Sequence, residues 1–299
     1  VNYEAFTKTG LQTPVGPSSV VIAAGETTVI PLTALATESK LIAVHIRAEG
    51  GNIAAWLQQK TMRGLAAGGL ELIAPNAGPT TSAVIPAIEI QGSAAAKKLM
   101  QQNIDYEDTS AALAIFVPGE QPANIGLQVL GANQKTYGTV VQQTAEAGAT
   151  TLIQLSDLAD GSFTAYLNSD VPIVAAVRYS HSDLKATPQT DFAWAQPAAE
   201  FKSRVLALPK SAGSRVFLSN QGSADASVQV TNLLTGAGLS VKVVAGAFTV
   251  VTGKAGAVWQ IDSDEPIAAG VVASTSKGVA NIAVQDYKNL GGKVRVRLR

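Results

Sequence analysis

Acidic side chains form the two clusters whose spacing best suits chemistry. One is Asp105, Glu107 and Asp108 in the segment DYEDT, and the other is the segment DSDEP at 262–266. Paired carboxylates serve as general acid and base, or as oxygen ligands for a hard cation. Neither cluster has the glycine-containing loop of twelve residues that calcium sites use. We therefore expect solvated acidic turns and no bound metal. Asp105, Glu107 and Asp108 are the better metal candidates because they lie in an insertion.

One of the two histidines, His181, stands among hydroxyl and carboxyl groups. Ser180, Ser182 and Asp183 flank it in the segment YSHSD. A Ser-His-Asp triad is a line of hydrogen bonds in space, which sequence neighbours do not make. The chain also has no GxSxG nucleophile elbow. We expect His181 to lie in a loop and to be a binding candidate, and we expect no catalytic residue.

Aromatic and cationic side chains offer two further binding candidates. The indoles of Trp56, Trp194 and Trp259 would stack on sugars if exposed, but each lies in an expected strand, where core packing is the default. We keep Trp56 as a candidate. The segment KVRVRLR places its four cations on one face of a strand, where they could bind an anionic polysaccharide, a lipid headgroup or a partner. Protection of an edge strand by charge is the favoured explanation. The four cations are Lys293, Arg295, Arg297 and Arg299.

The composition is typical of an all-β protein and excludes several functions. Charged residues make up only 15% of the chain, and small and β-branched residues fill the deficit. The 22 basic and 22 acidic residues balance, which disfavours nucleic-acid binding because that function needs a positive field. The absence of cysteine excludes thiol catalysis, thiolate metal sites and disulfides, and we expect no cofactor. No apolar run approaches the ~18 residues that span a bilayer, so we expect membrane contact only through an anchor removed upstream of Val1.

These candidates are positioned by a repeated segment. NSDVPIVAAVRYS at 168–180 returns without a gap as DSDEPIAAGVVAS at 262–274, and a weaker copy is found within residues 23–77. Self-similarity of this kind outranks local motifs in deciding the fold. The segments between the copies alternate or are rich in β-branched residues, and Gly, Asp, Asn and Pro separate them. We interpret the Asx-Ser-Asp-x-Pro opening as a hairpin turn that leads into a core strand.

The repeat predicts serial immunoglobulin-like β-sandwich modules. Module 1 covers residues 1–82 and lacks its first strand, module 2 covers 83–199, and module 3 covers 200–290. A basic strand at 291–299 would complete module 1. Such closure is also typical of a β-propeller, which is the alternative fold. Module 2 carries a helical insertion near 92–109, with Ser93 as the expected N-cap.

The sequence also resembles a known group of proteins. The module VFLSNQGSADASVQV … VVAGAFTVV … DSDEPIAAGVVAS resembles the immunoglobulin-like adhesion modules of exported bacterial proteins. RGLAAGGLELIAP and DFAWAQPAAEF are similar to segments of an uncharacterised family of exported actinobacterial proteins. The resemblance implies an extracytoplasmic protein, secreted or anchored to the cell envelope, and no known activity.

Three functions remain open at this point. The leading one is a non-enzymatic cell-envelope scaffold or platform that binds a protein or an envelope polysaccharide. The alternatives are a carbohydrate-binding protein and an accessory subunit of an enzyme that processes envelope glycans.

Overall fold

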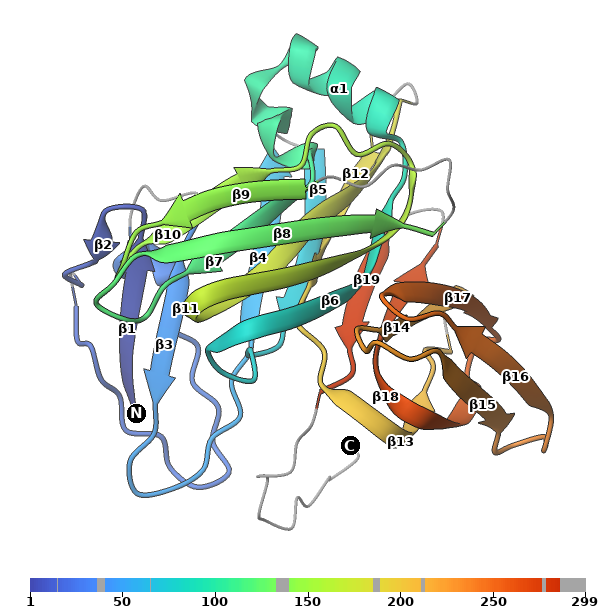
Figure 1. Cartoon of the computed structure of the whole chain (residues 1–299). Coiled ribbons are helices and arrows are strands. Elements are labelled where there is room, and N and C mark those ends of the chain that lie inside the picture. Colours follow the sequence, from blue (N-terminus) through green and yellow to red (C-terminus); the bar gives the residue numbers. More distant parts are fainter. Residues whose placement is uncertain are drawn as a thin grey trace.

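The protein is built almost entirely of β-strands, which confirms the all-β prediction (Figure 1). The computed structural model describes residues 1–14, 16–36, 41–64, 66–132, 140–184, 189–210, 213–275 and 278–285. The basic strand predicted at 291–299 lies outside these ranges.

Two consecutive units share one strand order. The first unit, residues 80–195, has the order β10-β7-β11-β8-β9, with β6 and β12 also on β11. The second unit, residues 200–283, has the order β16-β15-β18-β14-β17, with β13 and β19 on β18. The strands of the first unit are β6 (Thr80–Ile90), β7 (Ala112–Phe116), β8 (Ala123–Gly131), β9 (Val140–Ala145), β10 (Thr150–Gln154), β11 (Gly161–Asp183) and β12 (Gln189–Ala195). Those of the second are β13 (Glu200–Ala207), β14 (Gly213–Asn220), β15 (Ala226–Asn232), β16 (Gly238–Val243), β17 (Ala247–Gly253), β18 (Val258–Ser274) and β19 (Val279–Ala283).

One long strand in each unit crosses from one half of the sheet to the other. The N-terminal half of β11 pairs with β6 and β8, and its C-terminal half pairs with β7 and β12. At the junction, Asp170 accepts hydrogen bonds from the backbone N–H of Asn124 (2.8 Å) and from its side-chain amide (2.6 Å). Asp264 in β18 accepts the corresponding bond from the Ser227 N–H at 2.7 Å. The predicted hairpin turn is therefore wrong, because the repeated Asp lies where a continuous strand changes partners.

The described residues before β6 have a different strand arrangement. They form a three-stranded sheet of order β2-β1-β3 and a separate two-stranded hairpin. The predicted boundary at residue 83 falls inside β6, and the boundary at 200 coincides with the start of β13. The elements are β1 (Asn2–Thr7), β2 (Gly10–Leu11), the 3-10 helix η1 (Leu32–Ala34), β3 (Ala43–Arg47), β4 (Leu57–Arg63) and β5 (Ala66–Ile73).

The predicted helical insertion is confirmed, but the side chain that caps it is Asp160 and not the expected Ser93. Helix α1 (Ser93–Gln102) is followed by the 3-10 helix η2 (Ile104–Thr109). The Asp160 carboxylate accepts the backbone N–H groups of Gly92 (3.0 Å) and Ser93 (2.7 Å), so Ser93 is not the N-cap. Gly92 has φ +72°, and a Cβ there would lie 1.8 Å from the Ser182 carbonyl oxygen. Only glycine fits this tight passage from β6 into α1.

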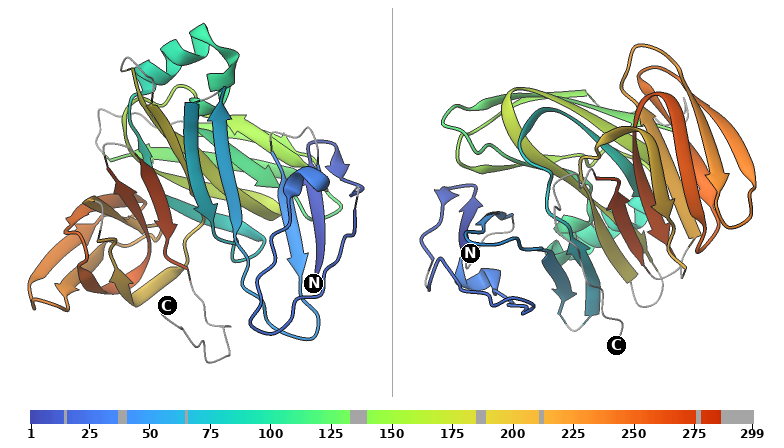
Figure 2. Two further views of the ribbon diagram at one scale, coloured as in Figure 1. Left: turned by 180° about the vertical axis from the view of Figure 1, so that it is seen from behind. Right: turned by 90° about the horizontal axis from the view of Figure 1, so that it is seen from below.

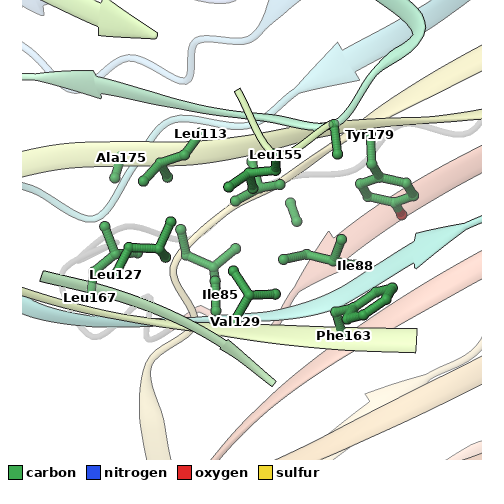
Figure 3. Packing of buried hydrophobic residues seen from close by; sticks show 14 of the residues in the cluster. Ile85, Ile88, Leu113, Leu127, Val129, Leu155, Phe163, Leu167, Ala175 and Tyr179 are labelled. Carbon is green, nitrogen blue, oxygen red and sulfur yellow. The ribbon is translucent and has the colours of Figure 1, made fainter. Parts of the chain in front are cut away.

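The core of the first unit continues into the second. Side chains from several strands of the first unit fill it, among them Ile85, Leu113, Leu127 and Phe163 (Figure 3). The same cluster includes Phe217, Phe248, Val272 and Val279, which belong to strands of the second unit. The second unit also has a core cluster of its own. Because the cluster of the first unit takes in side chains of the second, the two units pack as one body rather than as separate modules on a linker.

Close backbone approach reinforces this contact. A Cβ at Gly270 in β18 would lie 2.9 Å from the side chains of Pro86 and Ala87 in β6. Asn281 in β19 donates from its side chain to the Ala87 carbonyl oxygen at 2.6 Å. Figure 2 shows the two units side by side, with the β4–β5 hairpin across the back of the first unit and next to strands of the second.

Candidate functional site

The acidic insertion forms an ion-pair cluster with two buried arginines. Asp108 in η2 lies 2.7 Å from Arg63 Nη1 on β4 and 2.8 Å from Arg178 Nη2 on β11. The side chains of these arginines are 4% and 8% exposed, so Asp108 provides most of the compensation that their buried charges require. The Asp105 carbonyl oxygen also accepts from Arg63. Two of the three metal candidates, Asp105 and Asp108, thus bond to the arginines.

Aromatic rings cover the same arginines. The guanidinium of Arg63 lies over the ring of Tyr106 at 4.7 Å, and that of Arg178 lies over Phe192 at 4.4 Å. Burial lowers the pKa of Arg178 from its usual value, and the negative charge of Asp108 opposes this effect. The cluster joins β4, η2, β11 and β12 and therefore fastens the hairpin to the first unit. Among the described residues, no group of three or more His, Cys, Asp or Glu could hold a metal ion.

His181 lies in strand β11 rather than in the predicted loop. Its Nε2 is 3.0 Å from the Glu89 carbonyl oxygen, and burial lowers its pKa although nearby carboxylates oppose the shift. The neighbouring Ser180 hydroxyl donates to the Thr109 carbonyl oxygen. Histidine and serine thus bond to separate backbone carbonyls, one in β6 and one in η2, which is an arrangement for fastening β11 to these two elements rather than for activating a nucleophile. Residues 185–188, which follow in the predicted loop, lie outside the described residues.

The three tryptophans have different environments. Trp259 is buried at 7% exposure, and Trp194 donates from Nε1 to Gln59 Oε1 at 2.7 Å. Trp56, which precedes β4, is 59% exposed. The candidate basic residues Lys293, Arg295, Arg297 and Arg299 lie outside the described residues.

The hairpin of β4 and β5 buries several polar side chains and exposes several apolar ones. Three polar side chains of the inner side, Gln59, Arg63 and Glu71, bond to the first unit. The outer side carries an apolar stripe, here called the hairpin face, formed by Trp56, Met62, Leu70 and Leu72. These four side chains are 59%, 50%, 53% and 60% exposed. This reverses the usual burial of apolar side chains, which makes the hairpin face a candidate for interaction.

A second polar group lies where the hairpin meets both units. Glu71 on β5 accepts hydrogen bonds from the backbone N–H groups of Asn281 in β19 and Trp194 in β12. Asp191 in β12 accepts the Val279 N–H at 2.8 Å. Burial, with the nearby negative charge of Asp191, raises the pKa of Glu71 to about 8. Sequence reasoning missed Glu71; the available signal was an acid between two leucines, Leu70 and Leu72, in an alternating strand.

Two surface depressions lie beside α1, between Lys97 and the turn at Ser156, and the smaller one extends to Ser180. Within the ranges that the structure describes, no helix is both long enough and apolar enough to cross a membrane.

Comparison with known families places the sequence. Residues 1–258 match a family of unknown function, DUF5719. The chain belongs to this family. The match covers the N-terminal sheet, the hairpin and the first unit completely, and it ends at the first residue of β18. A search of curated proteins gives no match. The family therefore groups the chain with its relatives without assigning a reaction.

Proposed function

We propose that the protein is a non-enzymatic binding platform of the cell envelope whose contact surface is the hairpin face. The observation that carries the proposal is the reversed hairpin. Gln59, Arg63 and Glu71 point inward and are bonded, while Trp56, Met62, Leu70 and Leu72 point to solvent. Exposed apolar side chains that gather on one strand pair are typical of interaction surfaces.

The chemistry of the hairpin face favours a protein partner over a polysaccharide. Sugars stack on flat aromatic rings, but three of the four apolar side chains here are aliphatic or thioether groups. Methionine and tryptophan are enriched in protein interfaces. Lys60 and Gln58 lie between the apolar residues on the same side of β4 and would give a partner polar contacts within the hairpin face.

Two finer features of the proposal rest on the sequence resemblance. We propose that the units are immunoglobulin-like and that the protein is exported in an actinobacterium. The antiparallel pairing and the repeated strand order of the two units support the first feature. Signal-dependent secretion of the full-length gene product in its native cell would test the second.

The binding test compares matched substitutions on two exposed strands. Purified chain is sedimented with isolated cell-envelope fractions of the producing organism. Leu70→Asp with Leu72→Asp is expected to weaken binding at least tenfold, since each buried leucine contributes roughly 1.5–3 kcal/mol and ~1.4 kcal/mol is a factor of ten. The control Leu239→Asp changes an exposed leucine (49%) on β16 and is expected to leave binding within about twofold of wild type.

Treatment of the envelope fractions identifies the partner class. Protease treatment should abolish binding, whereas glycan digestion should not. Retention after protease treatment and loss after glycan digestion would instead indicate a polysaccharide partner. Equal binding by the double variant and by wild type would overturn the role of the hairpin face.

A further inference from the structure

The edges of two sheets meet beneath the hairpin. In the described part of the chain, β12 pairs only with β11, and β19 pairs only with β18. The two strands nevertheless lie next to each other. Their edge N–H groups need other acceptors, because a buried donor without a partner costs about 1–3 kcal/mol. We call this contact between β12 and β19 the seam.

Two carboxyl groups supply these acceptors. Asp191 accepts the Val279 N–H across the seam at 2.8 Å. Glu71 reaches in from the hairpin and accepts N–H groups from both sides, that of Trp194 in β12 and that of Asn281 in β19. Glu71 is only 6% exposed, so its carboxyl group holds three parts of the molecule together in a place that water scarcely reaches.

The surroundings of Glu71 disfavour a negative charge. From β12 it faces Asp191, whose charge repels an ionised Glu71, and β19 (VANIA) has no titratable side chain. Gln59 lies directly across on β4, and Tyr179 is fully buried on β11. The buried cation of the hairpin, Arg63, is directed to Asp108 and Thr190. Burial and repulsion together raise the pKa of Glu71 to about 8, although the hydrogen bonds from the Asn281 and Trp194 N–H groups oppose the shift.

We propose that Glu71 is a proton-dependent latch. With its carboxyl group protonated, the hairpin closes the seam between β12 and β19, and loss of this proton loosens the hairpin and the seam together. The inference does not depend on what the hairpin face binds. Its consequence is that the fit of the hairpin on the two units responds to the acidity of the surroundings.

The direction of the pH dependence follows from the pKa of Glu71 in the open and the closed seam. An open seam exposes Glu71 to water, where it regains its ordinary pKa of 4.5, while in the closed seam the pKa is about 8. A carboxyl whose closed-state pKa is raised stabilises the closed state fully below pH 4.5. As the pH rises from 4.5 to about 8, the equilibrium constant for closing the seam falls by about tenfold per pH unit. Above about pH 8 it stays constant.

Amide hydrogen exchange of the full chain, expressed as protection factors, tests the latch. Peptides covering β5 and β19 are expected to lose protection by about tenfold per pH unit between pH 5 and pH 8, and to change little above that range. Glu71→Gln replaces the acid by a neutral group of the same shape and should make protection of these peptides constant with pH. Glu120→Gln, at an exposed turn, should behave as wild type.

Two further readouts keep the test decisive. Asp191→Asn removes the repelling charge and should move the end of the pH-dependent range to lower pH, so it supports the latch even if Glu71→Gln does not fold. Peptides from β8, in the core of the first unit, should not follow the same profile. Constant protection of β5 and β19 in wild type, or the same pH profile in Glu71→Gln, would overturn the proposal.

Discussion

At the scale of single residues, the acidic insertion shows how position decides the role of a carboxylate. Asp108 belongs to a segment whose composition suits a cation site, yet it lies between two guanidinium groups. Neither arginine is near it in the sequence, so spacing along the chain could not reveal the pairing. The sequence therefore predicted an acidic cluster in the insertion, but it did not predict that Arg63 and Arg178 are the partners of Asp108.

Removal of the Asp108 charge should destabilise the fold. Asp108→Asn would leave two buried guanidinium groups without their counter-ion, and we expect a loss of about 2–4 kcal/mol in the free energy of unfolding. This is somewhat below the value for a fully buried pair, because Asp108 itself is 35% exposed. Urea unfolding measures the change.

Asp105→Asn is the matched control in the same segment. Asp105 bonds to Arg63 through its backbone carbonyl, which the substitution keeps, and its side chain is exposed. Its effect should stay within about 0.5 kcal/mol. Similar losses in both variants would show that the arginine pairs contribute little.

At the scale of elements, sequence patterns predicted the features that depend on neighbouring residues. Strand alternation, the helical insertion at 92–103 and the equivalence of β11 and β18 all follow from neighbouring residues and from the repeat. The change of strand partners along β11 did not, because it depends on a hydrogen bond from Asn124 in β8 to Asp170 in β11. The Glu71 site did not either, since it joins residues of β5, β12 and β19. Both depend on tertiary contacts that no sequence window contains.

The cap of α1 provides a prediction at this scale. The pKa of Asp160 is lowered overall, because hydrogen bonds from Ser93 and Gly92 outweigh the opposite effect of burial. Its contribution to stability is therefore present above the ordinary pKa of 3.8 and is lost as the pH falls through the lowered value. Asp160→Ala should cost about 1 kcal/mol at pH 7, measured by urea unfolding.

Comparing Asp160→Ala with wild type at low pH separates the capping effect of the Asp160 charge from the packing effect of its side chain. The difference between Asp160→Ala and wild type should shrink when the carboxyl group is protonated. A difference that stays the same at pH 7 and pH 2.5 would mean that the side chain acts through its volume and not through its charge.

At the scale of the whole molecule, duplication has produced one body instead of two. Phe217, Phe248 and Val272 of the second unit belong to the core of the first, and Gly270 permits the backbone of β18 to approach β6. The hairpin lies against both units, fixed by Arg63 and Glu71. A rigid base of this kind would present the hairpin face in a constant orientation, which lowers the ordering cost of binding.

The most direct test of this account compares the unfolding of the two units. Trp194 reports on the first unit and Trp259 on the second, so each is kept as the sole tryptophan by replacing the other two with Phe. Because the core cluster of the first unit includes side chains of the second unit, the two urea transitions should coincide in midpoint and slope once each is corrected, by circular dichroism, for the stability of its variant. Two separate transitions, with one unit unfolded while the other remains native, would contradict the single body on which the proposed platform rests.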